Sequence, residues 1–389
     1  MAATTKQGQI TTMDTHSRNT DLMTIVAELG PKFAARAAEH DAEGTFVAKN
    51  FQEMRDCKLF SARIPVELGG GGASPAEMCE VLRELAHYDS ATALSIAMHS
   101  HLLATLVYRV KHDMMPSSEP ALRKIAAEEL VLVSTGGSDW LDGSGELTKV
   151  EDGFRFTGRK VFGSGSPAGD LLLTMGVYDD PESGPTVMHF AVNMHDDGVT
   201  VLQDWDTLGM RGIGSNSVQM KDVFVPEAGI SLSRAQGNWH KFFDIIAPLA
   251  FSLIMSVYQG IAESARNIAV EQASKKREDT IVQDQVGIMD NELLITQTAV
   301  AEMVRLASED TPPTIEKSNL IARYKTISTN AAIRTVEQAM VVAGGQGYFK
   351  GMGLERRFRD IQAARYHPIQ EPKQHRFSGR VALGLDPVG

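Results

Sequence analysis

The chain has 389 residues, of which 43% are apolar and 22% are charged. This composition is ordinary for a globular protein with room for two or three domains. Its formal net charge of -11 disfavours a general nucleic-acid binder, because a polyanion would be repelled. Its two cysteines, Cys57 and Cys79, are too few for a disulfide framework, so we expect a cytoplasmic protein.

The segment 21–128 is predicted to be a helical domain. Apolar residues recur at helical spacing near its start, and Ala91–Val110 is apolar enough for a buried helix. Between them, Gly69–Gly72 breaks the pattern, and Ser74-Pro75 provides an N-cap followed by a residue suited to the first helical turn. The preceding residues, 1–20, lack the apolar core of a secretory signal, so we expect a flexible tail there.

The segment 129–232 has the texture of a β domain. Glycines become frequent, and short runs rich in β-branched and aromatic residues are separated by turn signals such as Asp152-Gly153 and Asp196–Gly198. Strands at such spacing are typical of a small barrel or sandwich. The expected strands are Leu130–Ser134, Phe154–Phe156, Leu171–Met175, Val187–Val192, Val199–Leu202 and Val218–Val225.

Helices return over 233–389. Three long periodic runs, Pro248–Lys276, Ile281–Leu306 and Thr314–Ala343, predict an antiparallel four-helix bundle. The order of helices, then strands, then helices predicts a multidomain α+β fold, and few large enzymes insert a β domain between two helical ones. Because the chain contains no run of eighteen apolar residues, no transmembrane span is expected.

A glycine-dense turn, Gly344–Tyr348, follows the last long helical run. Such a turn lets backbone N–H groups approach a ligand and can form an anion-binding concavity suited to a pyrophosphate, although glycine also ends many helices without binding anything. Two ionisable residues, His367 and Glu371, lie a short way beyond it, and a cofactor loop beside proton-handling groups indicates redox chemistry. The candidate cofactor-binding glycines are Gly344, Gly345 and Gly347.

Five stretches resemble the acyl-CoA dehydrogenase superfamily, in the family's order and over about 21–384. This resemblance implies the acyl-CoA dehydrogenase fold, with FAD bound between the β domain and the C-terminal bundle. It also implies a homotetramer, with a homodimer as the alternative. The five stretches are Arg63–Gly70, Gly158–Gly165, Leu208–Gly212 continued by Val223–Pro226, Phe243–Pro248, and Gly344–Asp360.

The resemblance also implies which side chains surround the cofactor. Phe162 and Ser164 stand where the family places an aromatic ring and a hydroxyl against the isoalloxazine, and such a hydroxyl can stabilise the reduced ring. Ser138 aligns with the family's flavin and substrate loop, although this chain lacks the Glu-Pro of that loop. Arg277 stands where the family reaches the FAD of a neighbouring subunit. Without the family, Arg277 is an ordinary cation at a helix C-terminus.

Asp244, His99 and Tyr348 are the candidate substrate-binding residues. Asp244 belongs to a stretch in which typical dehydrogenases carry an arginine that helps to hold the substrate, and Ala247 replaces that arginine here. An uncharged side chain at that place predicts an altered substrate head or an altered reaction. We expect no metal site.

The position of the catalytic base is altered as well. In the family a glutamate lies eight residues after the aspartate at Asp360, and here that place holds Pro368; the alternative family position falls on Ile245. Glu371 is the preferred base and His367 the second, because either could reach the site from a rebuilt loop. Glu371 also has the ordinary interpretation of a solvated loop acid. The implied reaction is α,β-desaturation of an acyl thioester of CoA or a carrier protein.

Two other functions stay open. His367-Pro368 resembles two-component flavin monooxygenases of the dibenzothiophene type, in which a histidine near the flavin handles a proton; His99 would be its counterpart on a helix before the β domain. Electrons would then end on oxygen rather than on an electron-transfer partner. A third possibility is a silent flavoprotein that serves as an assembly module, because both family positions for the carboxylate are lost.

Overall fold

The computed structural model describes residues 15–389 except 116, 136 and 138. The first fourteen residues of the expected tail lie outside this range, and helix α1 begins at Thr15. Ser74 caps α3 as expected: its Oγ accepts from the Glu77 amide at 3.2 Å, and its own amide donates to the Glu77 carboxylate at 2.7 Å. The N-terminal helices are α1 (Thr15–Glu43), α2 (Ala48–Asp56), α3 (Pro75–Tyr88), α4 (Ser90–Lys111) and α5 (Ser118–Glu128).

The middle of the chain forms one mixed sheet of eight strands, ordered β6-β7-β3-β2-β4-β5-β8, with β1 paired in parallel to β4. The expected barrel or sandwich is realised as this single sheet. In β3 the rings of Phe154 and Phe156 are buried and Arg155 between them is exposed, which is the alternation of a half-buried strand. The strands are β1 (Leu132–Ser134), β2 (Glu146–Val150), β3 (Gly153–Gly163), β4 (Leu171–Asp180), β5 (Gly184–Asn193), β6 (Val199–Val201), β7 (Asn216–Pro226) and β8 (Leu232–Ala235).

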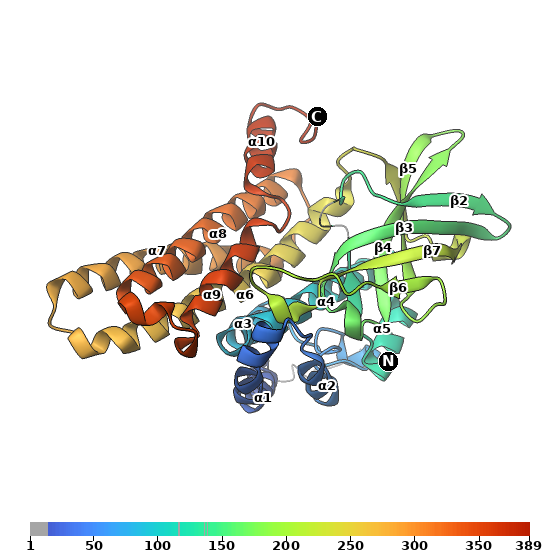
Figure 1. Cartoon of the computed structure of the whole chain (residues 1–389). Helices are drawn as coiled ribbons and strands as arrows, with labels where there is room; N and C mark the ends of the chain where they lie inside the picture. Colours follow the sequence, from blue (N-terminus) through green and yellow to red (C-terminus); the bar gives the residue numbers. More distant parts are fainter. Residues whose placement is uncertain (1–14, 116, 136, 138) are drawn as a thin grey trace, which may run out of the picture.

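The C-terminal part is helical and extends away from the sheet (Figure 1). Three long helices, α6, α7 and α8, pack against one another, and the short helix α9 runs back along α8 and α6. The expected helical bundle is therefore present. Its helices are α6 (Lys241–Ala273), α7 (Thr280–Ser308), α8 (Ile315–Ala343), α9 (Leu354–Ile361) and α10 (Glu371–Ala382), with the 3-10 turns η6 (Gly344–Tyr348) and η8 (Gln362–Arg365) after α8 and α9.

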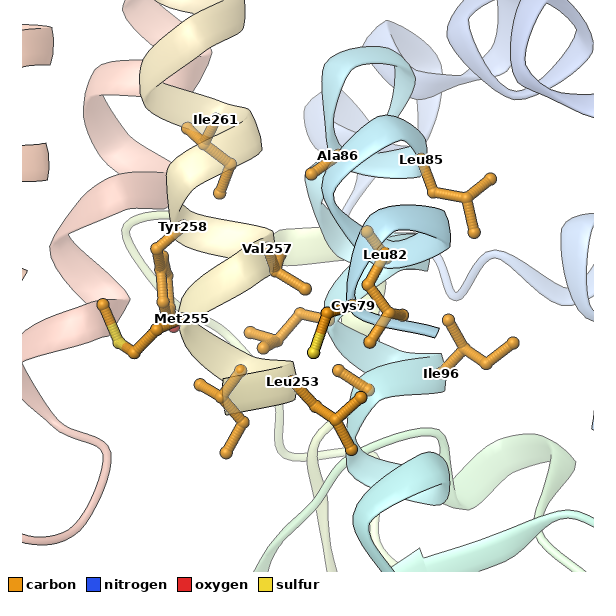
Figure 2. Packing of buried hydrophobic residues seen from close by; sticks show 14 of the residues in the cluster. Cys79, Leu82, Leu85, Ala86, Ile96, Leu253, Met255, Val257, Tyr258 and Ile261 are labelled. Carbon is orange, nitrogen blue, oxygen red and sulfur yellow. The ribbon is translucent and has the colours of Figure 1, made fainter. Parts of the chain in front are cut away.

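The N-terminal helices and the C-terminal bundle share one hydrophobic core. Figure 2 shows Cys79 and Leu82 of α3 beside Leu253 and Val257 of α6. The two helices approach closely at Gly260, where an added Cβ would lie 2.1 Å from the main-chain oxygen of Arg83. The sheet has a separate core of its own. The functional cavity lies where these two packed bodies meet.

Two segments of the described chain, Ser90–Lys111 and Lys241–Lys276, are long and apolar enough to cross a membrane. Their apolar windows are 83% and 78% buried inside the fold. They are accordingly the central core helices of this structure, and the cavity is built largely on them.

Candidate active site

A cavity of about 820 Å³ lies between α4, the first turns of α6, the sheet and the segment 359–370. Its walls are mainly apolar, and large aromatic side chains come from the sheet and from α6. Among the described residues that line it there is no aspartate and no glutamate. The aromatic residues in the wall are Trp140, Phe162, Phe190, Trp205, Trp239, Phe242, Phe243, Phe251 and Tyr366.

One end of the cavity presents a flat ring and two hydroxyls. Phe162 stands near the end of β3 with a left-handed φ of 60°, beside a register shift between Lys160 and Gly163. Its ring is 51% exposed and meets Trp205 edge-on at 6.2 Å. The hydroxyls of Ser164 and Ser215 lie 2.8 Å apart. An aromatic face beside paired hydroxyls suits a planar heteroaromatic ring with polar edges, and an isoalloxazine has that chemistry.

His367 enters the cavity from the turn that follows η8. Its ring meets Tyr258 of α6 at 5.6 Å. The pKa of the His367 imidazole is lowered to about 3, chiefly by burial and then by the nearby cation of Lys325. His367 is therefore neutral at physiological pH and can accept or relay a proton within the cavity. His367 is among the residues that line the cavity.

The two histidines of α4 have different surroundings. His99 does not line the cavity: its Nε2 donates to the Phe60 carbonyl at 2.8 Å, and its Nδ1 accepts from the Leu132 amide at 3.0 Å. His101 does line the cavity, and its Nε2 lies 3.2 Å from the Ser134 hydroxyl. Among the described residues, Nδ1 of His101 has no well-aligned hydrogen-bond partner. His101, which sequence reasoning missed, is the α4 histidine that faces the cavity.

Helix phase was the signal that could have separated the two. In α4 the residues that line the cavity recur every three or four positions, from Leu94 through Met98 and His101 to Thr105. His99 lies on another side of that helix, toward β1.

Two predicted residues lie outside this cavity. Glu371 is the first residue of α10; it accepts from the Asn330 amide at 3.1 Å, lies 3.6 Å from His375, and its side chain is 44% exposed. Asp244 accepts from the Ser318 hydroxyl at 2.6 Å and faces a second cavity, of about 470 Å³, on the other side of α6. The structure therefore does not bring either carboxylate to the groups around His367.

The glycine turn follows α8 at the end of the bundle away from the sheet (Figure 1). Arg277 directly follows the 3-10 turn Ser274–Lys276, which continues α6. An added Cβ at Gly344 or Gly345 would meet nothing within 4 Å, so no described part of the chain packs against these two glycines. Tyr348 is 83% exposed. The Arg277 side chain is 81% exposed and forms an ion pair with its neighbour Glu278. Gly347 is buried against α9. Ser138 is outside the described residues.

Comparison with known proteins decides the family. The model for the acyl-CoA dehydrogenase N-terminal domain matches residues 24–113, and the model for the acyl-CoA dehydrogenase C-terminal domain matches residues 253–372. Together these two matches span more than half of the chain. The chain belongs to the acyl-CoA dehydrogenase family. The expected fold and the resemblance on which it rests are thereby confirmed.

The relatives that match over nearly their full length include a putative acyl-CoA dehydrogenase and several enzymes with other activities. The chain is 27% identical to a putative acyl-CoA dehydrogenase, YdbM, of Bacillus subtilis (strain 168), over 89% of this chain and 92% of that protein. It is 26% identical to the dibenzothiophene monooxygenase of Mycolicibacterium goodii, over 95% of this chain and 94% of that enzyme. The crystal structure of KijD3 in complex with FMN and a dTDP-sugar superposes with a TM-score of 0.86 at 25% identity, over 95% and 94% of the two chains.

These relatives make the chain a flavin-dependent oxidoreductase of the acyl-CoA dehydrogenase family. The cofactor bound in the KijD3 structure is FMN rather than the expected FAD. The activities for which these relatives are named, among them dibenzothiophene monooxygenase and amino sugar nitrososynthase, favour the monooxygenase alternative over acyl-CoA desaturation. In this chain, Phe162, Ser164 and Ser215 are the described residues whose chemistry fits a flavin ring.

Proposed function

We propose that this protein is a monooxygenase that takes up reduced flavin and oxygenates an apolar substrate of aromatic size. The observation that carries the proposal is the wall of the cavity: its described residues include three histidines and no carboxylate. Removal of an α-proton from a thioester needs a base beside the substrate, and Glu371 is bonded to Asn330 instead. The histidines are His101, His189 and His367.

A reduced flavin bound in this cavity would supply the two electrons with which molecular oxygen is divided between the substrate and water. Phe162 would hold one face of the flavin ring, and the hydroxyls of Ser164 and Ser215 would bond its polar edge. The apolar walls would exclude bulk water and so limit the side reaction in which oxygen is released as hydrogen peroxide. Neutral His367, with His101 in the same wall, would move the proton that the departing water needs.

We infer that the distant glycine turn acts on a neighbouring copy. Gly344, Gly345, Arg277 and Tyr348 are exposed, and none of them is among the residues that line the cavity. The family resemblance assigns Arg277 to the flavin of a neighbouring subunit. A homo-oligomer would give these residues a ligand that their own chain does not bring to them, and FMN or FAD would be held by two copies together.

The purified full chain, mixed anaerobically with chemically reduced FMN or FAD and then with oxygen, tests the proposal. We expect the protein to bind the reduced flavin and to slow its reoxidation and its release of peroxide relative to free flavin. His367→Ala should return peroxide release toward that of free flavin, whereas Glu371→Gln should behave as the parent. Bleaching of the oxidised flavin by an acyl-CoA, slowed by Glu371→Gln, would instead establish desaturation.

A further inference from the structure

The cavity contains a guanidinium at the end away from His367. Arg109 lies near the end of α4 and lines the cavity, as do Thr105 and His101 on the same helix. Consecutive members of this set are separated by four positions, so the three side chains form one row along the helix. With a rise of about 1.5 Å per residue, Arg109 lies about 12 Å along the helix axis from His101. A substrate that reaches both must be elongated.

Arg109 has few internal contacts. One of its Nη atoms lies 3.5 Å from the sulfur of Met115, and its guanidinium lies 5.3 Å from the centre of the Phe242 ring. No carboxylate among the described residues forms an ion pair with it. Burial lowers its pKa, and no acidic neighbour opposes that effect. Its planar set of N–H donors is therefore left available to the cavity.

Arg234, on β8, shows what a structural arginine looks like in the same region. It donates to the main-chain oxygens of Trp140 and Leu141, each at 2.6 Å, and to His189 at 3.1 Å. All of these partners belong to the protein, so Arg234 holds the wall together. Burial is the chief cause that lowers the pKa of His189, and the cations of Arg234 and Arg109 lower it further, so this end of the cavity is electropositive.

An aromatic cluster adjoins Arg109 through Phe242, whose ring centre lies 6.2 Å from that of Phe243. Trp140 meets Phe243 edge-on at 4.8 Å and Trp239 at 5.8 Å, and Phe242 stacks under the Arg109 guanidinium. Rings arranged in this way favour another flat ring. An aromatic body placed among them would direct a substituent toward Arg109.

We propose that Arg109 binds an oxyanion substituent, a carboxylate or a sulfonate, of an otherwise apolar aromatic substrate. This inference rests on the proposed function for the identity of the site. The guanidinium fork offers two parallel N–H donors to such a group, and desolvation by the aromatic walls strengthens the pairing. This partly buried cation, which has no carboxylate partner among the described residues, would gain a counter-ion when substrate binds.

Equilibrium binding of matched probes to the purified full chain tests this proposal without turnover, so a failure of the oxygenase reaction would not affect it. The probes are 2-naphthoate, 2-naphthalenesulfonate and the neutral 2-naphthamide, measured by titration calorimetry. We expect at least one of the two anions to bind about 10- to 100-fold more tightly than the amide. Arg109→Met should abolish that preference, and Arg109→Lys should retain part of it.

Lys111→Met is the matched control, because Lys111 lies two residues further along α4, is 57% exposed and faces the second cavity. It should keep the anion preference. If the unsubstituted protein binds neither anion more tightly than the amide, Arg109 is not an anion site. The same conclusion follows if Lys111→Met removes the preference or if Arg109→Met keeps it. Removing this unpaired, partly buried charge should also leave the urea midpoint unchanged or raised, whereas removing a structural arginine would lower the midpoint.

Discussion

The ammonium of Lys325 lies 3.0 Å from the main-chain oxygen of His367. It also donates to the carbonyls of Ala364 at 3.3 Å and Ile369 at 3.4 Å, and no carboxylate among the described residues forms an ion pair with it. Lys325 is 3% exposed, and burial lowers its pKa to about 8. A lysine of α8 therefore holds the turn that carries the cavity histidine, and its charge lowers the proton affinity of that histidine.

Lys325→Met should slow oxygenation and change its pH dependence. Without the cation, the pKa of His367 rises toward its ordinary value, so the acid limb of the rate profile should move to higher pH. Three carbonyls would also lose their donor, and we expect a rate loss of about 10-fold or more from the loosened turn. The profile is measured by product formation between about pH 3 and 7, which runs from the pKa of His367 in the parent to the ordinary pKa of an imidazole. A lower rate with an unmoved acid limb would assign Lys325 to folding alone.

Substitution of the two α4 histidines should have opposite consequences. His99→Phe leaves the buried Phe60 carbonyl without its donor and the buried Leu132 amide without its acceptor. The free energy of unfolding should therefore fall by about 2–4 kcal/mol. His101→Phe should change stability by less than about 1.5 kcal/mol, because His101 makes one weaker bond, and should lower oxygenation strongly. Urea unfolding and turnover of both variants check this. Equal stability loss in the two would contradict the assignment of His99 as structural.

The surface of α7 predicts self-association. Ile281, Ile288 and Ile295 recur every seven residues and are 68%, 51% and 41% exposed, so they form one apolar stripe along the helix. We expect the chain to be a homo-oligomer at micromolar concentration by light scattering. Ile288→Glu should produce smaller species. Ala301→Glu should not, because Ala301 is exposed but lies six residues beyond Ile295 and therefore on another side of the helix. A parent that is monomeric throughout this range would overturn the prediction.

The buried histidines predict loss of stability in mild acid. Burial lowers the pKa of His99 and His101 to about 4 and that of His189 and His367 to about 3. An imidazole in the unfolded chain has a pKa of about 6.5. Below that pH the unfolded chain therefore binds more protons than the folded one, so the stability decreases as the pH is lowered. Three carboxyls oppose this effect, because burial raises the pKa of Asp360 to about 6 and also raises the pKa of Glu129 and of Asp244. The urea midpoint should be lower at about pH 5 than at about pH 7.5; a flat or inverse dependence would contradict the burial of these imidazoles.

The sequence predicted the order of the three parts because each part has its own hydrophobic period. Strands with β-branched runs, such as Val187–Val192 and Val218–Val225, were found within β5 and β7. Strand β2 was missed because only Leu147 among its five residues is buried, so its composition resembles a polar loop. This segment is a strand because it pairs with β3, and such a long-range contact is not visible in the local composition.

The site was harder to predict than the fold, because it depends on the phase of each helix and on long-range contacts. His367 reaches the cavity as predicted, whereas Glu371, only four residues later, begins a new helix and is bonded to Asn330. Lys325 gave no signal at all, because a lysine in a long amphipathic helix is ordinarily a surface residue. Its partners are 39 to 44 residues further along the chain.

The position of the glycine turn at the far end of the bundle has a thermodynamic consequence. If two copies hold one flavin, then cofactor binding and assembly are linked, and each must strengthen the other by the same factor. Dilution of the protein would release its flavin, and an excess of flavin would draw dilute chains together. The apparent affinity for the cofactor would then depend on protein concentration, and an isolated chain would be an incomplete enzyme even when perfectly folded.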